Sequence, residues 1–250
     1  MESNTINPKI LLLILSLAIT FQIMLWLNFD INDEFDMIDL LYLLGLISCF
    51  TASFAVSKKF GSSKIFGKAY MILGLAFVSF FVGETLYLYL NMLGETPYPA
   101  IHVDLFFFMF YPLVTLYLII NIRFFRPTLS LKHKILLVII FPSSVLFYSY
   151  ITYSADAIDS FEYFYGLIFM IFASVPLSFS ILGATIFNQT VLSSIWRLLT
   201  LGIAISTIAD ILYYSLEIIG EYDSMHPVNT LWMISYMIIF YALYKHIKTF

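Results

Sequence analysis

The sequence has little charge and almost no cysteine. Only 11% of its 250 residues are charged, and Cys49 is the single cysteine. One cysteine excludes an intrachain disulfide, and so few charges are untypical of a soluble domain, in which about 25% of residues are charged. The sequence also contains no glycine-rich nucleotide loop, no His/Cys metal spacing and no nucleophile elbow. We therefore predict no cofactor, no bound metal and no nucleic-acid partner.

Apolar residues take the place of the missing charges. The chain is 61% hydrophobic, with 26 Phe and 18 Tyr, which suits lipid contact and interfacial aromatic belts. Eight apolar runs have about the 20 residues that a bilayer requires. They are Ile10–Phe29, Met37–Ser57, Tyr70–Leu93, Asp104–Ile122, Ile135–Ser154, Tyr163–Phe187, Leu198–Ile219 and Thr230–Tyr244. The pattern predicts an all-α integral membrane protein with eight transmembrane helices in contact with membrane lipids.

The basic residues predict the orientation of these spans. With eight spans, all 12 Lys and Arg fall on one side of the membrane. They are Lys9, Lys58, Lys59, Lys64, Lys68, Arg123, Arg126, Lys132, Lys134, Arg197, Lys245 and Lys248. The loops on the other side are acidic. By the positive-inside rule, we expect a multi-pass protein of the cell membrane with both termini in the cytoplasm.

The two halves of the chain repeat one another. A shift of about half the chain length aligns acids, tyrosines, glycines and histidines. The matched pairs are Glu84 with Asp210, Tyr87 with Tyr213, Gly94 with Gly220, Glu95 with Glu221, His102 with His226, Asp104 with Asn229 and Tyr111 with Tyr236. This pattern predicts a tandem duplication, with repeats at 1–125 and 126–250. Because each unit has four spans, the two units are parallel repeats about an axis along the membrane normal.

Two acids interrupt the apolar runs. Glu84 and Asp210 each precede a glycine by ten residues (84 to 94, 210 to 220), which places them about 15 Å below the outer interface. An acid at that depth costs about 2.5–3.5 kcal/mol, so we expect both to face the protein interior. Helical spacing aligns each acid with further polar groups, which are Tyr87 and Asn91 in one half and Tyr213 and Glu217 in the other. These six residues predict either interhelical hydrogen bonds or a polar pocket between spans three and seven.

The outer loops carry a second polar group. Asp104 and Asn229 stand where they could cap spans four and eight. His102 and His226 lie near these positions, and together with Glu95 and Glu221 they could form a pH-sensing or metal cluster, although their spacing favours no particular ligand set. Capping is the favoured interpretation of Asp104 and Asn229.

Two segments resemble a known family. Residues 97–113, PYPAIHVDLFFFMFYPL, follow GETLY, and the second acid-bearing span is followed by Trp232-x-x-x-Tyr236. This arrangement is similar to the multi-span membrane region found upstream of diguanylate cyclase and histidine kinase domains. These 250 residues contain no kinase or cyclase sequence. From the resemblance we therefore expect a stand-alone sensory or ligand-binding module that acts through a separate signalling protein.

A second, weaker resemblance concerns the acid-bearing segments themselves. Residues 196–212, WRLLTLGIAISTIADIL, and the pair Gly83-Glu84 are similar to motifs of lysoplasmalogenase-like membrane hydrolases. That resemblance implies lipid hydrolysis with Glu84 and Asp210 as acid and base. The parallel repeats alone suggest a third possibility, a small-solute or proton-coupled transporter.

Overall fold

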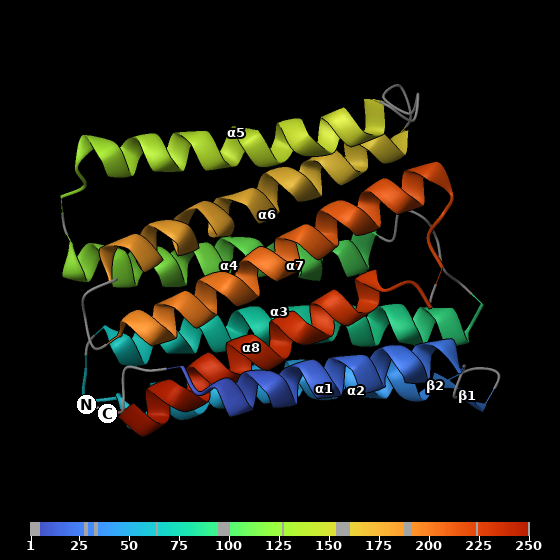
Figure 1. The fold of residues 1–250 in the computed structure, drawn as a ribbon, viewed down its shortest axis with the longest axis horizontal. Helices are drawn as coiled ribbons and strands as arrows, with labels where there is room; N and C mark the ends of the chain where they lie inside the picture. Colours follow the sequence, from blue (N-terminus) through green and yellow to red (C-terminus); the bar gives the residue numbers. More distant parts are fainter. Residues whose placement is uncertain are drawn as a thin grey trace.

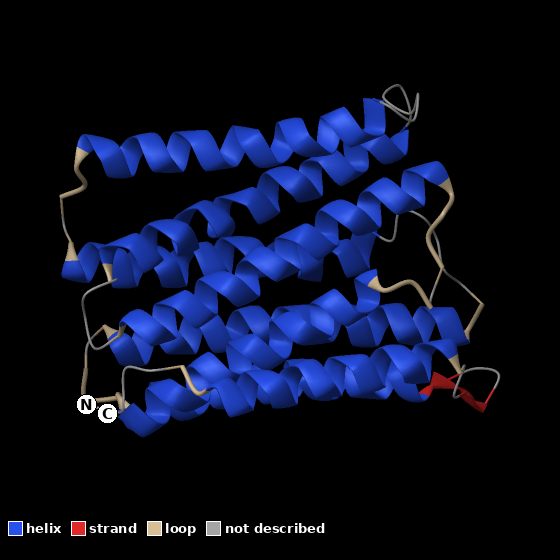
Figure 2. Ribbon diagram, in the orientation of Figure 1, coloured by secondary structure: helices blue, strands red, loops and turns tan. Residues whose placement is uncertain are grey.

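The chain folds into a bundle of long helices with one small hairpin (Figure 1). The computed structural model describes residues 6–27, 30–32, 35–63, 65–94, 101–126, 128–153, 161–187, 192–223 and 225–249. The helices are α1 (Pro8–Trp26), α2 (Met37–Lys59), α3 (Phe66–Met92), α4 (Ile101–Phe125), α5 (Leu131–Tyr153), α6 (Phe161–Ile186), α7 (Ser193–Ile219) and α8 (Val228–Thr249). Strands β1 (Asp30–Asn32) and β2 (Phe35–Asp36) pair antiparallel at the end of the bundle opposite the termini (Figure 2). The sequence did not predict these strands.

The predicted helical architecture is confirmed. Each apolar run forms a helix, and α1 to α7 are long and apolar enough to cross a membrane. Helix α8 does not meet that criterion, because polar and aromatic residues such as Asn229, Trp232 and Tyr236 lower its hydropathy. It packs against α1, α2 and α7. Its less apolar side chains therefore face other helices, where hydrogen-bond partners are close.

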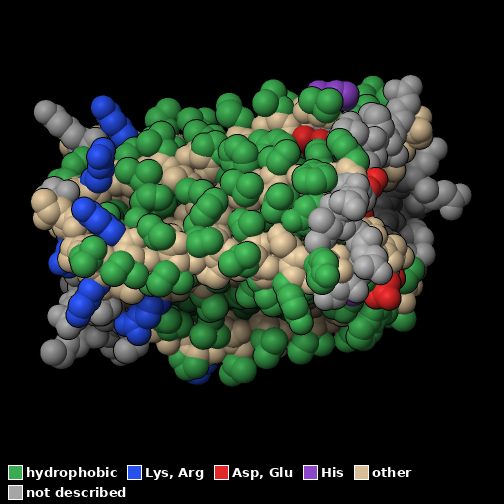
Figure 3. Space-filling view, turned by 90° about the horizontal axis from the view of Figure 1, so that it is seen from above, with side chains coloured by type: hydrophobic (Ala, Val, Ile, Leu, Met, Phe, Trp, Pro, Cys, Tyr) green, Lys and Arg blue, Asp and Glu red, His purple; other side chains and the backbone are tan. Residues whose placement is uncertain are grey.

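The outer surface of the bundle is apolar. Helix α5 is the clearest case, because Val138 is 70% and Leu146 is 68% exposed. Hydrophobic side chains cover the middle of the molecule in Figure 3, between a basic end and an acidic end. An apolar band of this kind is what a bilayer covers and what a soluble protein avoids.

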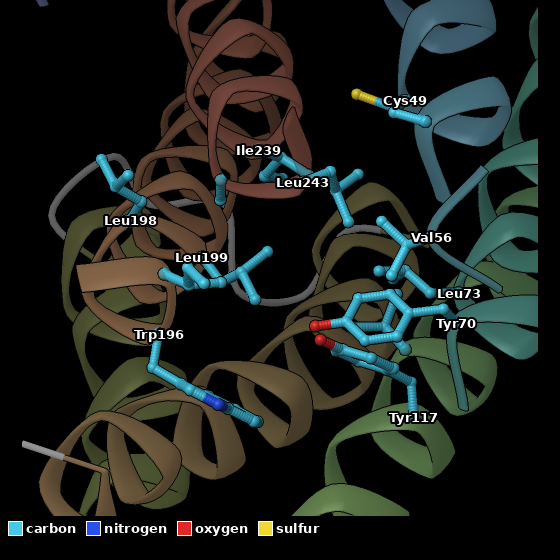
Figure 4. Close-up of a cluster of buried hydrophobic side chains, with 14 of the residues drawn as sticks. Cys49, Val56, Tyr70, Leu73, Tyr117, Trp196, Leu198, Leu199, Ile239 and Leu243 are labelled. Carbon is cyan, nitrogen blue, oxygen red and sulfur yellow. The ribbon is translucent and has the colours of Figure 1, made fainter. Parts of the chain in front are cut away.

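The largest part of the core lies between α2, α3, α4, α7 and α8 (Figure 4). Tyr70 and Tyr117 pack with ring centroids 5.1 Å apart, and the indole of Trp196 stacks on Phe187 at 4.6 Å. Gly183 lets α6 approach this indole. A Cβ at Gly183 would lie 2.3 Å from the Trp196 ring, so an alanine there requires the ring to move.

The ends of the bundle differ in charge. Both termini lie at one end (Figure 1), and in Figure 3 the Lys and Arg side chains gather at that same end while Asp and Glu lie toward the other. At the acidic end, Gly220 ends α7 with φ of 69°, and Gly94 follows α3 with φ of 67°. Glycine adopts this left-handed conformation without steric cost. The two glycines therefore end these helices where the sequence predicted.

Candidate functional site

Asp210 is held by two neighbouring helices. It lies on α7 and is 7% exposed. The Trp232 indole N–H on α8 donates a hydrogen bond of 2.9 Å to Oδ1, and the Tyr111 hydroxyl on α4 lies 3.4 Å from Oδ2. A buried carboxylate requires such donors. Asp210 therefore links α4, α7 and α8, which is the interhelical role that the sequence left open.

Glu84 lies near the same aromatic side chains. It is partly buried on α3, and none of the described residues forms a hydrogen bond with it. Tyr42 on α2 and Tyr236 on α8 each lie within electrostatic range of both Glu84 and Asp210. Their rings contact edge to face, with centroids 5.5 Å apart. The structure therefore directs both acids toward a common interior.

The two acid-bearing helices do not run side by side. Helix α3 packs mainly against α2 and α4, whereas α7 packs against α6 and α8. Aromatic side chains of α2, α4 and α8 thus lie between the two acids. We call the whole group the acid–aromatic cluster; its members are Tyr42, Glu84, Tyr87, Tyr111, Asp210, Tyr213, Glu217, Tyr222, Trp232 and Tyr236.

The part of the cluster toward the acidic end is more exposed. Tyr213 lies within electrostatic range of Glu217, and its ring centroid lies 5.4 Å from that of Trp232 and 4.8 Å from that of Tyr222. Tyr87 is 44% exposed and lies within electrostatic range of both Glu84 and Glu217. The predicted polar stripes on α3 and α7 therefore come together at Tyr87 and Glu217.

Tyr222 enters the cluster from the segment between α7 and α8. Its hydroxyl donates a hydrogen bond of 3.2 Å to Asn229 Oδ1. Burial raises the pKa of Tyr222 to about 12, although the hydrogen bond to Asn229 acts in the opposite direction. The phenol is therefore neutral at physiological pH and serves as a donor.

Three oxygens at the cluster are buried without a hydrogen-bond partner among the described residues. They are Tyr42 Oη, Glu217 Oε2 and Ser235 Oγ. Ser235 is completely buried, and with Asp210, Tyr111 and Tyr236 it lines an internal cavity of about 20 Å³. That volume accommodates about one water molecule. Buried polar groups normally have hydrogen-bond partners. These oxygens can therefore still accept a hydrogen bond from another molecule.

Several predicted residues lie elsewhere. Asn91 is exposed, and no described residue links it by its side chain to the cluster. Glu95 lies outside the described residues. Glu221 is exposed, next to the end of α7.

The predicted helix caps were wrong. Helix α4 begins at Ile101, so Asp104 lies within its first turn, where a carboxylate is still favourable to the helix dipole. Asn229 lies inside α8 and accepts from Tyr222 instead of capping. At α8 it is His226 that accepts, through Nδ1, from the Val228 N–H at 3.2 Å.

The outer histidines occupy different sites. His102 lines an open groove of about 340 Å³ with Asp104, Phe108 and Tyr165, between α4 and α6. His226 belongs to the start of α8. Within the described part of the chain, no three or more His, Cys, Asp or Glu side chains are arranged to hold a metal ion.

Sequence reasoning missed half of the cluster. Tyr42, Tyr111, Tyr222, Trp232 and Tyr236 were not predicted as site residues. Of these, Tyr111 and Tyr236 could have been found, because the predicted repeat matches them with each other. The others depend on how the helices rotate.

No protein-family model, curated protein or solved structure matches this chain.

Proposed function

We propose that the chain is an eight-span ligand-binding membrane module of the sensory type, with its ligand site at the acid–aromatic cluster. The observation that carries the proposal is the convergence of Glu84 and Asp210, from two distant parts of the chain, on tyrosines that include Tyr42, whose hydroxyl has no hydrogen-bond partner among the described residues. Acids within the membrane are costly, and they are mostly found where they serve a function. Unpartnered polar oxygens beside them favour a site that receives another molecule.

The contacts between helices support a duplicated architecture as part of the proposal. The packing of α2 on α3 and of α3 on α4 in the first half corresponds to that of α6 on α7 and of α7 on α8 in the second. The contact between α4 and α6 likewise corresponds to that between α8 and α2. Each acid also lies near a tyrosine of the other half. Asp210 lies near Tyr111 of the first half, and Glu84 lies near Tyr236 of the second. In the proposed architecture α8 is the eighth span, and residues 1–125 and 126–250 are the two repeats.

The orientation supports ligand entry from outside the cell. The basic end with both termini is the proposed cytoplasmic end, by the positive-inside rule. Tyr87 and Tyr222, the members of the acid–aromatic cluster nearest the other end, are partly exposed. A signal bound there would pass to a separate protein, as the resemblance to membrane-sensor regions implies.

Ligand binding agrees better with the geometry than lipid hydrolysis does. A general base needs a carboxylate oxygen free to take a proton from water. The Trp232 indole N–H already bonds to Oδ1 of Asp210 at 2.9 Å, and the Tyr111 hydroxyl lies 3.4 Å from Oδ2.

Labelling of introduced cysteines tests the proposal. In a Cys49→Ser background, we expect a membrane-impermeant maleimide to label a Tyr87→Cys variant in right-side-out vesicles. A Leu146→Cys variant, at comparable depth on the exposed face of α5, is the lipid-facing control and stays unlabelled. Equal protection of both positions would show that no aqueous path reaches the cluster and would overturn the proposal. Proton-dependent solute uptake into such vesicles would indicate a transporter instead.

A further inference from the structure

We infer that the ligand of the acid–aromatic cluster is a small organic ammonium cation. The inference rests on the proposed ligand-binding function and specifies the chemistry of the ligand. It follows from the charge of the cluster, the rings around it and the oxygens that lack partners.

The cluster is rich in carboxylates and has no basic side chain. Glu84, Asp210 and Glu217 all belong to it, and Asp39 lies within electrostatic range of Glu84. Every described Lys and Arg lies in or beside the helix ends at the basic end of the bundle. The two histidines of the acidic end belong to the α4–α6 groove and to the start of α8. A group of acids with no cation of its own favours a positively charged ligand.

Aromatic rings surround these acids. Tyr42 meets Trp232 at 6.3 Å between ring centroids and Tyr236 at 5.5 Å, and Tyr213 meets Trp232 at 5.4 Å and Tyr222 at 4.8 Å. Faces of Tyr and Trp rings attract ammonium groups, most strongly where water is excluded. Carboxylates combined with several such rings favour an organic cation over a hydrated metal ion.

The unpartnered oxygens supply an independent observation. Ser235 is completely buried, and its hydroxyl faces the cavity that Asp210 also lines. Tyr42 Oη and Glu217 Oε2 are likewise buried without a partner among the described residues. An ammonium group has donors and no acceptor, so it complements oxygens that can accept. A water molecule in the 20 Å³ cavity can extend this contact to Ser235.

The members of the cluster that lie nearest the acidic end are Tyr87 and Tyr222. Tyr222 belongs to the segment between α7 and α8, and Tyr87, in the last turns of α3, is 44% exposed. Because the cavity beside Asp210 has a volume of only about 20 Å³, the cation must be small, with its charge near Asp210.

Charge is tested with an isosteric pair. Ethylammonium and ethanol are close in size and shape, but only ethylammonium is charged. We expect methylammonium or ethylammonium, whose N–H groups can donate to the unpartnered oxygens, to raise the unfolding temperature of the full chain in phosphatidylglycerol nanodiscs, and ethanol to leave it unchanged. Asp210→Asn and Glu84→Gln should each weaken binding by about tenfold or more. The exposed Glu221→Gln variant is the matched control.

The outcomes separate this inference from the proposed function. If ethanol stabilises the protein as well as ethylammonium does, and Asp210→Asn removes both effects, the site stands and its preference for cations is refuted. No stabilisation by either cation, with Tyr87→Cys still labelled, also refutes the cation alone. Loss of labelling together with absence of binding overturns both. A parallel arm in nanodiscs that contain phosphatidylethanolamine identifies the source, since a lipid headgroup already in the site would abolish the effect of free ethylammonium.

Discussion

The hydrogen bond from Trp232 to Asp210 should contribute measurably to the stability of the bundle. At 2.9 Å it has ordinary N–H···O geometry, whereas the Tyr111 hydroxyl lies 3.4 Å from the other oxygen, beyond the usual range for O–H···O bonds. Interhelical hydrogen bonds in membrane proteins contribute about 0.6 kcal/mol on average and up to about 1.7 kcal/mol. We therefore expect a coupling energy of about 1 kcal/mol for Trp232 with Asp210, and at most about 0.5 kcal/mol for Tyr111 with Asp210.

A double-mutant cycle measures both values. Each cycle compares the wild-type protein, two single variants and the double variant, all unfolded reversibly in mixed micelles. The single variants are Trp232→Phe, Tyr111→Phe and Asp210→Leu, and each of the first two is also combined with Asp210→Leu. The free energies of unfolding are then compared. The cycle cancels the area lost when the indole is shortened to a phenyl ring. A Trp232–Asp210 coupling below about 0.3 kcal/mol, or one no larger than that of Tyr111, would falsify the view that this bond fixes Asp210 in place.

Three further predictions concern the core, alkaline pH and the single cysteine. Gly183→Ala should destabilise the protein by about 1–3 kcal/mol, because the new methyl group collides with the Trp196 indole; an unchanged unfolding temperature would contradict the tight contact. Because burial raises the pKa of Tyr222 to about 12, the neutral phenol favours the folded state, and its contribution is complete below pH 10 and declines as the pH rises toward 12. Tyr222→Phe should reduce this alkaline loss of stability in thermal melts, and an unaltered pH profile would refute the assignment. Cys49 is completely buried, so maleimide should modify it only after unfolding in denaturant, and rapid labelling of the folded protein would contradict the core packing.

Under the proposed sensory function, a ligand at the cluster would act on the arrangement of the helices. Both acids lie near one group of tyrosines. A ligand that bridges Glu84 and Asp210 would bias how α3 and α7 are held relative to α8. Such a bias is what a sensory module needs, because a ligand shifts an equilibrium only through different contacts in the two states.

Much of the architecture could be predicted from the sequence alone. Apolar runs of spanning length fix the helices because a chain in lipid must satisfy its own backbone hydrogen bonds. Gly94 and Gly220 marked the outer ends of α3 and α7 because glycine readily adopts positive φ. Glu84 and Asp210 were recognisable because a carboxylate inside an apolar run is costly unless it faces the interior.

Tertiary structure alone decided what surrounds these acids. Sequence spacing places a residue on a helix but does not give the rotation of that helix against its neighbours. That rotation brings the Trp232 indole to Asp210 and turns Tyr42 toward Tyr236. It also leaves Asn91 exposed and makes His226, instead of Asn229, the residue that caps α8. The sequence thus determined which helices form and which of them carry acids. Packing between helices determined the partners of those acids, because side-chain contacts depend on distances between helices that a linear pattern does not contain.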